Sequence, residues 1–226
     1  MFEIVDLFSP SEFEFLRALI TRHVKKKVEA LDQLSNYHIF ASDDIHCSLA
    51  SKKERILAEE DAHKLFALPA IQNLLNEHPG YRVCNVVYDS ETQEDRPEFY
   101  FRLVRPNKQS DIGTPHCDFW FDEAMKTNFG RGNTIKYWIP VIIEHGKNGL
   151  LFYPNMTKDA PYIIADNNGF RTPKINCEFS ELGEPALPQP NYGQAIMFGD
   201  DILHCGALNT GSTTRVSMEI TLVKRK

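Results

Sequence analysis

The sequence predicts a mainly β protein of the α+β class: an antiparallel double-sheet barrel (a jelly roll) with N-terminal helices packed on the outer face of one sheet. Three observations predict it. Residues 1 to about 80 carry helix-start signals and apolar residues at helical spacing. From Tyr81 onward, short alternating runs rich in aromatic and β-branched residues take their place. About eight such runs follow one another, which suits two sheets packed face to face.

The first expected helix starts at a capping box. In Ser9-Pro10-Ser11-Glu12, the serine is the N-cap, the proline takes the first helical position, and the glutamate is placed to bond back to the N-cap. The apolar residues that follow at helical spacing are Phe13, Leu16, Ile20 and Val24. A second start signal is Ser51-Lys52-Lys53-Glu54. A short helix is expected from Pro69 to Asn76, ending before the Pro79-Gly80 pair.

The expected strands begin at Tyr81. They are Tyr81–Tyr88, Phe99–Val104, Thr114–Phe121, Thr134–Ile143, Leu150–Tyr153, Gln194–Phe198, Ile202–Cys205 and Thr213–Val223. The proline-rich stretch 154–190 shows little periodicity and is expected to be mostly loop, which makes it a candidate lid or substrate loop. We expect one domain over residues 1–226, with a helical elaboration at 1–80 and the jelly-roll core at 81–226.

Charge and cysteine content restrict the partners. The net charge is −6, from 25 basic and 31 acidic residues, which argues against nucleic acid or an anionic membrane surface. The N-terminus lacks a charged-then-apolar signal pattern, and no apolar run approaches the ~18 residues needed to span a bilayer. The five cysteines form no CxxC pair, as is typical of reduced cytosolic thiols. We expect a cytoplasmic protein that acts on a small molecule, and whether it forms a homodimer stays open.

The stretch Thr114–Phe121 holds a histidine and an aspartate two residues apart, His116 and Asp118. On a β-strand both side chains share one face and Cys117 points away. A third candidate ligand is His204, which follows a Gly-Asp-Asp turn 86 residues beyond Asp118. Two imidazoles and one carboxylate form a facial set that holds one side of a ferrous ion and leaves the other side open. The sequence therefore predicts a catalytic metal site at these three residues.

Arg215 lies eleven residues past the last of these ligands, in a strand that alternates two kinds of residue. One face carries Thr213, Arg215, Ser217, Glu219 and Thr221, and the other carries Val216, Met218, Ile220 and Leu222. A guanidinium binds a carboxylate through a planar fork, and a hydroxyl two residues on can support the same carboxylate. Arg215 and Ser217 are therefore predicted to receive the far end of a dicarboxylate.

Four further residues are predicted to serve the same pocket. Thr134, Lys136 and Trp138 share one face of their strand, so either of the first two could hold a carboxylate while Trp138 walls the pocket. Arg102 lies between two apolar residues on its strand and is placed to face the cavity. The alternative for Lys136 is a solvated strand residue.

Together these motifs resemble those of the iron(II)/2-oxoglutarate-dependent dioxygenases, most of all the phytanoyl-CoA dioxygenase-like branch, over roughly residues 81–223. The resemblance implies a double-stranded β-helix with iron(II) held by His116, Asp118 and His204. It implies 2-oxoglutarate on that iron, with its distal carboxylate on Arg215, and dioxygen as the second cosubstrate. Members that halogenate replace the carboxylate ligand by a small residue, so the aspartate favours hydroxylation. The stretch 154–157 reads Pro-Asn-Met-Thr where the branch commonly has Pro-Gly-Ser-His, a weak match.

We therefore expect an iron(II)- and 2-oxoglutarate-dependent oxygenase that hydroxylates a polar small molecule and releases succinate and carbon dioxide. Polar side chains on the predicted inner face, such as Lys136 and Glu219, favour a polar substrate over a long acyl chain. Two alternatives stay open. One is a cupin-like metalloenzyme that uses the same ligands without 2-oxoglutarate, and the other is a catalytically inactive jelly-roll binding protein. The Arg215–Ser217 receptor argues against both, because neither needs it.

Overall fold

The structure, a computed structural model, describes residues 1–28, 38–41, 44–84, 97–125, 129, 131–156, 160–167 and 170–225. Within these residues the fold is α+β, and each pairing between named strands is antiparallel. Residues 85–88, the second half of the expected strand Tyr81–Tyr88, lie outside the described residues. The same holds for the following residues 89–96.

The largest sheet is built around β10, the strand that starts with Arg215. Its strands within the described residues are β1 (Phe2–Asp6), β2 (Tyr81–Val83), β3 (Tyr100–Val104), β4 (Thr134–Ile142), β8 (Gln194–Gly199) and β10 (Arg215–Lys224). Their order is β1-β8-β4-β10-β2, and β3 pairs with the first half of β10. Because β10 pairs with β4 along one edge and with β2 and β3 along the other, it lies inside the sheet.

Two short strand pairs complete the strands of the described part. They are β5 (Leu150–Phe152) with β9 (His204–Gly206), and β6 (Tyr162–Asn167) with β7 (Phe170–Ile175). An isolated antiparallel bridge between His116 and His204 extends the β5–β9 pair by one more segment. The predicted strands around residues 99–104, 134–143, 150–153, 194–198, 202–205 and 213–223 are thus confirmed, with ends shifted by one to a few residues.

The helices precede most of the strands. Those that the structure describes are α1 (Pro10–Lys27), η2 (His38–Ala41), α2 (Asp44–Ser48), η3 (Lys53–Arg55), α3 (Glu59–Phe66), α4 (Pro69–Glu77), η4 (Gln109–Asp111), α6 (Asp118–Met125) and η5 (Phe179–Leu182). The predicted capping box is confirmed: the backbone N–H of Glu12 donates to Ser9 Oγ, and the N–H of Ser9 donates to the Glu12 carboxylate. Within the described residues, no helix is both long and apolar enough for a membrane span.

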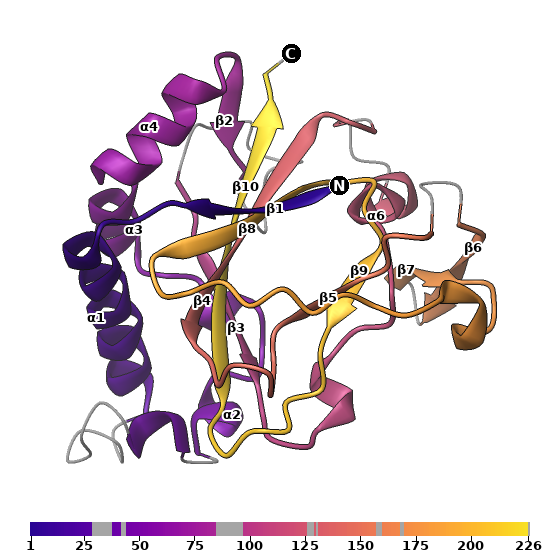
Figure 1. Cartoon of the computed structure of the whole chain (residues 1–226). Coiled ribbons are helices and arrows are strands. Elements are labelled where there is room, and N and C mark those ends of the chain that lie inside the picture. The colour runs from indigo at the N-terminus through magenta and orange to yellow at the C-terminus, as the bar shows by residue number, and fades with distance from the viewer. Residues whose placement is uncertain are drawn as a thin grey trace.

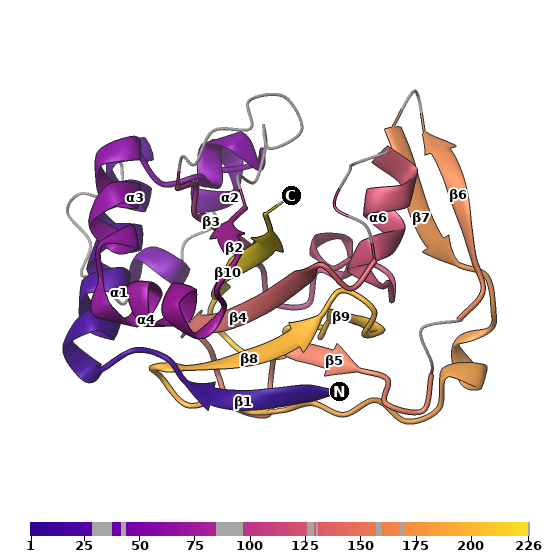
Figure 2. The same cartoon turned by 90° about the horizontal axis from the view of Figure 1, so that it is seen from above.

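Helices α1, α3 and α4 cover one face of the large sheet. Figures 1 and 2 show them on one side of β4 and β10, with α6 and the β6–β7 pair on the opposite side. Leu16 and Ile20 of α1 belong to one buried cluster with Ile139 of β4 and Met218 of β10. Each fully buried aliphatic side chain of this kind contributes about 1.5–3 kcal/mol. Strand side chains alternate, so the residues next to Ile139 in β4 and next to Met218 in β10 point to the face of the sheet opposite the helices. The candidate site described below lies on that face.

The expected strand Thr114–Phe121 is wrong. His116 makes only an isolated bridge, and the chain turns into helix α6 at Asp118. The buried side chains of Cys117, Trp120 and Ala124 are three and four residues apart, which is the helical period. A short aromatic run is compatible with both the strand period and the helical period. Here the helix is the conformation in which the run packs into a second hydrophobic cluster.

The expected loop at 154–190 is also wrong in part, since it contains the β6–β7 pair. This pair packs against α6, where Tyr162 stacks on Trp120 with ring centroids 4.5 Å apart. Pro173 lies within β7, opposite Ile164. Within the described residues, β6 and β7 pair only with each other, so both are edge strands. Proline, which has no backbone N–H to donate, is tolerated in edge strands.

Strand β1 is the third departure, because residues 1–80 were expected to be mostly helix. Phe2–Asp6 pairs with β8 at the edge of the large sheet, and Phe2 stacks on Phe152 with ring centroids 4.4 Å apart. The partner strand lies near the other end of the chain. Five residues with no local hairpin partner give little strand signal, so only tertiary pairing defines this strand.

Candidate metal centre

Three side chains that can bind a metal meet beside the β5–β9 pair. Among the described residues, His116, Asp118 and His204 each offer one ligand atom, and these atoms lie within 4.8 Å of one another. The backbones of the two histidines pair directly, with N–H···O distances of 2.9 and 3.0 Å. Asp118 enters from the first turn of α6, and its two oxygens lie 3.9 Å from His116 Nε2 and 3.9 Å from His204 Nε2. The predicted ligand set is therefore assembled, by a bridge and a helix start rather than by one strand.

Both histidines are held in the tautomer that a metal needs. His116 Nδ1 lies 2.8 Å from the carbonyl oxygen of Thr114, and His204 Nδ1 lies 2.9 Å from that of Ile202. A carbonyl oxygen only accepts, so each Nδ1 carries the proton and each Nε2 keeps its lone pair. Burial, reinforced by the neighbouring His204, lowers the pKa of His116 to about 4 and keeps its ring neutral. Orienting bonds of this kind are what ligating histidines usually have.

Asp118 is kept ionised by its surroundings. Burial alone would raise its pKa, but Lys136 and then the two imidazoles outweigh burial and lower the pKa of Asp118 to about 2. Lys136 Nζ lies 3.6 Å from Asp118 Oδ2 and 3.8 Å from Glu219 Oε2. Burial opposes the charge of Lys136, yet these two carboxylates hold its pKa above the ordinary lysine value. Lys136 is thus a partner of the metal ligand, not a solvated strand residue.

The Gly199-Asp200-Asp201 turn ties the two halves of the ligand set together. The backbone N–H of Phe119 donates to the carbonyl oxygen of Asp200, at the start of α6. The Asp200 side chain, only 1% exposed, accepts bonds from the N–H of Gly132 at 2.9 and 3.0 Å and from the hydroxyl of Thr134 at 3.1 Å. Cys117 Sγ donates to the carbonyl oxygen of Asp201 at 3.5 Å, so this thiol is turned away from the ligands. The turn before His204 therefore sets the position of Asp118.

A cavity of about 440 Å³ opens in front of the ligands. This volume is within the range of about 300–1,000 Å³ that is usual for small-molecule sites. The lining comes from β3, β4, β10, α6, β7 and the ligands, and it includes Glu98, Tyr100, Arg102, His116, Asp118, Phe121, Thr134, Lys136, Thr172, Lys174, His204, Gly206, Glu219 and Thr221. The predicted residues Arg102, Thr134 and Lys136 thus face the cavity. The other three predicted residues, Trp138, Arg215 and Ser217, are buried and are not among the described residues that line this cavity.

These buried residues form a cluster of hydrogen-bond donors without acceptors. Arg215 donates from Nη1 to the carbonyl oxygen of Gly149 at 2.5 Å. Its Nε and Nη2, the hydroxyl of Ser217 and the indole nitrogen of Trp138 have no partner within the part of the chain that the structure describes. Arg215 and Ser217 share one face of β10, and the guanidinium lies 5.8 Å from the centroid of the Trp138 ring. Burial and then the nearby Arg102 lower the pKa of Arg215 to about 9 although Glu219 opposes them, and among the described residues no carboxylate forms an ion pair with the guanidinium.

Gly206 connects this donor cluster with the metal ligands. It lies two residues after His204 on β9, pairs with Leu150, and lines the cavity. A Cβ added at Gly206 would lie 3.1 Å from Ile112 Cγ2 and 3.7 Å from Arg215 Nη1. Gly206 therefore lies close to the guanidinium, and Ile112 leaves no room there for a side chain. The β10–β4 register also shifts between Val216 and Ser217, a bulge of the kind that often re-aims side chains near a site.

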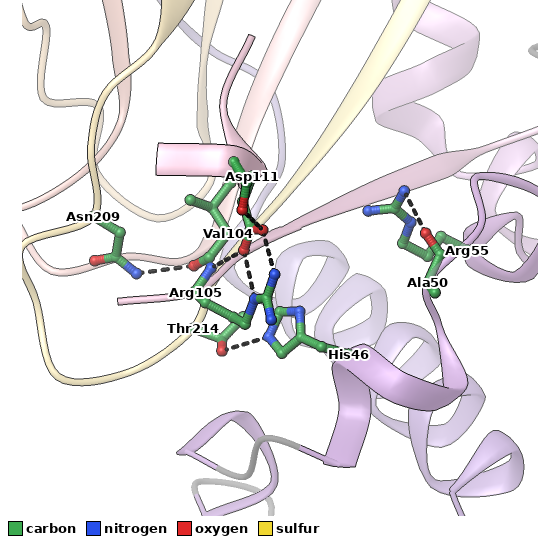
Figure 3. A network of polar contacts seen from close by, with 9 residues as sticks. His46, Ala50, Arg55, Val104, Arg105, Asp111, Asn209 and Thr214 are labelled. Atoms are coloured by element: carbon green, nitrogen blue, oxygen red, sulfur yellow. Dashed lines mark hydrogen bonds and ion pairs between the residues drawn. The ribbon is translucent and has the colours of Figure 1, made fainter. Parts of the chain in front are cut away.

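The backbone just before Arg215 is fixed by a polar network (Figure 3). Asn209, which is fully buried, donates from Nδ2 to the carbonyl oxygen of Val104 at 2.9 Å. His46 Nε2 and the hydroxyl of Thr214 lie 3.1 Å apart. These contacts join α2, the end of β3 and the start of β10. They fix the backbone from which Arg215 extends.

Sequence reasoning missed three residues of the site. Glu98 lies just before β3 and faces the cavity, as Arg102 does, because strand side chains alternate. The expected strand starts at Phe99, so this alternation was not extended to Glu98. Gly206 carried a signal as well, because it is two residues past His204. The role of Asp200 depends on Gly132, which no local pattern relates to it.

The comparisons with known proteins support this fold. No protein-family model matches the sequence, and no curated protein matches it. EctD from S. alaskensis, solved with 2-oxoglutarate and 5-hydroxyectoine, is 13% identical with a TM-score of 0.63, over 99% of this chain and 72% of that chain. This chain therefore has the same fold as EctD. The apo form of EctD gives 12% identity and a TM-score of 0.55 over the same shares, 99% and 72%.

A second structural match is ThoJ, described as a non-heme monooxygenase in complex with nickel. It is 12% identical, with a TM-score of 0.53, over 99% of this chain and 73% of that chain. At these identities the similarity establishes the fold. Together with the His116-x-Asp118 and His204 group, it confirms the resemblance that the sequence predicted, for the fold and for the set of metal ligands.

Proposed function

We propose that the chain is an iron(II)- and 2-oxoglutarate-dependent oxygenase that hydroxylates a polar small molecule and releases succinate and carbon dioxide. One observation carries the proposal. The chain holds a complete three-ligand group and a buried cluster of unpartnered donors, and Gly206, two residues after His204, lies close to the guanidinium of that cluster. We further propose that the large sheet and the β5–β9 pair are the two sheets of a double-stranded β-helix.

The three ligands fit iron(II). Two neutral imidazoles and one carboxylate on one side of a metal leave the other side open, and this set is typical of non-heme iron oxygenases. His116 and His204 present lone pairs from Nε2, and Asp118 presents a carboxylate between them. Lys136 compensates the charge of Asp118 in the absence of a metal.

The donor cluster fits the distal carboxylate of 2-oxoglutarate. The Nε and Nη2 atoms of Arg215 form a fork that matches the two oxygens of a carboxylate. Ser217 Oγ and Trp138 Nε1 supply two more donors to the same region. A bound carboxylate would also provide the counter-charge that Arg215 lacks. Unpartnered buried donors are costly, so their concentration at one place indicates a ligand.

The protein's own residues bind the metal, orient its ligands and line the cavity. Dioxygen is the oxidant for C–H hydroxylation; bound iron(II) would activate it, and 2-oxoglutarate would be the co-reductant that leaves as succinate and carbon dioxide. His116, Asp118 and His204 hold the metal, and the carbonyl oxygens behind the imidazoles fix their orientation. Lys136, Thr134 and Arg102 face the cavity, where we propose that they contact cosubstrate or substrate. Side chains of α6 and β7 line the cavity, and these two elements lie on the other side of the site from helices α1, α3 and α4 (Figure 2).

The two alternatives make different demands. A cupin-like metalloenzyme without 2-oxoglutarate would bind the metal but needs no dicarboxylate receptor. An inactive binding protein needs neither the neutral histidine tautomers nor the open metal face. The donor cluster around Arg215 favours the oxygenase over both.

The test is succinate release by the purified protein with iron(II), 2-oxoglutarate and dioxygen, before any substrate is known. Slow release in the absence of substrate is expected from the wild-type protein, and His204→Ala should abolish it because one of the three ligands is lost. Arg17→Ala, on the exposed face of α1, is the control and should release succinate like the wild type. Iron binding without succinate release would favour the cupin-like alternative, and absence of iron binding would favour the inactive binding protein.

A further inference from the structure

One carboxylate on the cavity surface has no role in the proposed reaction. Glu98 precedes β3 and lines the cavity together with Tyr100 and Arg102. Phe99, between the first two, is fully buried in the cluster that the helices cover on the other face. The side chain of Glu98 therefore follows the strand alternation toward the cavity.

The carboxylate of Glu98 is buried but incompletely satisfied. The residue is 7% exposed, and within the described residues no donor reaches its Oε2. A buried acceptor without a donor destabilises the folded state, and more so when it is charged. Such a group is expected to remain in a cavity only where a ligand completes it.

Two of the cations that line the cavity, Lys136 and Arg102, interact with carboxylates of the same cavity. Lys136 lies within 3.8 Å of both Asp118 and Glu219. Burial opposes the charge of Arg102, yet the carboxylate of Glu219 outweighs it and leaves the pKa of Arg102 above its ordinary value.

Lys52 and Lys174 also line the cavity, yet among the described residues no donor reaches Glu98 Oε2. Asp118 Oδ2 likewise has no hydrogen bond, but it has Lys136 at 3.6 Å and is a proposed metal ligand, whereas within the described part of the chain Glu98 has neither.

We propose that Glu98 selects the substrate, and that the substrate carries a protonated amine or another cationic N–H group. The inference rests on the proposed function, because it treats the cavity as a substrate site. A cation of this kind supplies both the hydrogen bond and the charge that the carboxylate of Glu98 lacks. The volume of about 440 Å³ suits a small amine beside the cosubstrate.

The first measurement needs no ligand. Glu98→Gln keeps the shape of the side chain and removes its charge, and Glu184→Gln, at an exposed position after η5, is the matched control. Because Glu98 lacks a donor at Oε2, the Glu98→Gln protein should melt at the same temperature as the wild type or higher. A melting temperature several degrees lower would mean that the carboxylate has a structural partner, and would overturn the inference.

The second measurement uses two matched probes, putrescine and the diol of the same chain length. Each is titrated calorimetrically into the protein loaded with iron(II) and 2-oxoglutarate without oxygen. The wild type and Glu184→Gln should bind putrescine about tenfold tighter than the diol or more, and Glu98→Gln should lose that preference. Equal affinity of the wild type for both probes, including no measurable binding of either, would overturn the inference. A preference that survives in Glu98→Gln would overturn it as well.

The proposed function and this inference can fail separately. Succinate release without substrate reports on the proposed function and does not involve the probes. If the wild type releases no succinate but prefers putrescine through Glu98, the cavity binds cations and the reaction class is wrong. If succinate is released and the probes bind equally, the oxygenase stands and Glu98 does not select the substrate.

Discussion

Replacing Arg215 by methionine removes the guanidinium fork while keeping most of the side-chain volume. If Arg215 receives the distal carboxylate of 2-oxoglutarate, the replacement leaves that carboxylate unpaired in a buried place. Removing one partner of a buried charge pair costs about 2–5 kcal/mol. Because about 1.4 kcal/mol is a factor of ten, the KM for 2-oxoglutarate should rise about 30- to 4,000-fold. Arg215→Lys keeps the charge without the fork and should give a smaller rise.

The stability of the same variant separates binding from structure. Without cosubstrate, Arg215→Met loses the bond from Nη1 to Gly149, worth about 0.5–1.5 kcal/mol. It also removes the unpartnered Nε and Nη2, each of which costs about 1–3 kcal/mol when buried. The two removed penalties together exceed the lost bond, so the unliganded variant should melt at the wild-type temperature or higher.

The assay for Arg215→Met is succinate release as a function of 2-oxoglutarate concentration, combined with thermal unfolding with and without 2-oxoglutarate. The wild type should gain stability from 2-oxoglutarate, and the variant should gain little at the same concentration. Arg17→Met, at a partly exposed position, is the matched control and should leave both unchanged. An unchanged KM would refute the assignment and move the carboxylate receptor elsewhere, with Lys136 as the next candidate because it faces the cavity.

Two further variants test the support of the site. Gly206→Ala places a Cβ 3.1 Å from Ile112 Cγ2 and 3.7 Å from Arg215 Nη1, so it should raise the KM for 2-oxoglutarate while iron(II) affinity is retained. A lowered iron(II) affinity with a normal KM would contradict the placement of the cosubstrate beside Gly206. Asp200→Asn replaces one of the carboxylate oxygens that accept from the Gly132 N–H and the Thr134 hydroxyl by an NH2 group, which donates. This should lower the free energy of unfolding by about 1–3 kcal/mol. For a chain of this size, each kcal/mol lowers the Tm by about 2–4 °C. An unchanged Tm for Asp200→Asn would show that the turn before His204 does not depend on these bonds.

The metal ligands could be predicted from the sequence because their spacing carries chemical information. A histidine and an aspartate two residues apart, a distant histidine after a Gly-Asp-Asp turn, and an Arg-x-Ser pair at a fixed offset are informative together even though each is common alone. His116 and Asp118 were predicted to share one face of a β-strand. The expected strand there was wrong, yet a bridge residue followed by a helix start brings both side chains to the same metal site.

Other features could not be predicted, because they are decided by distant partners. Strand β1 exists only by pairing with β8, and the β6–β7 pair is stabilised by packing on α6 despite Pro173. The lack of a partner at Glu98 Oε2 is likewise a property of the folded surroundings. Alternation along β3 can place this side chain on the cavity face, but only the structure reveals whether a donor reaches it.

The central claim is that the three ligands and the Arg215 cluster together bind iron(II) and 2-oxoglutarate. The most direct test is the visible absorption spectrum of the purified protein with iron(II) as 2-oxoglutarate is added without oxygen. Chelation of the iron by the keto acid should produce a charge-transfer band that rises with 2-oxoglutarate and saturates, and His204→Ala should not produce it. If metal analysis shows bound iron(II) in the wild type and no band forms, the protein does not use 2-oxoglutarate in the way proposed.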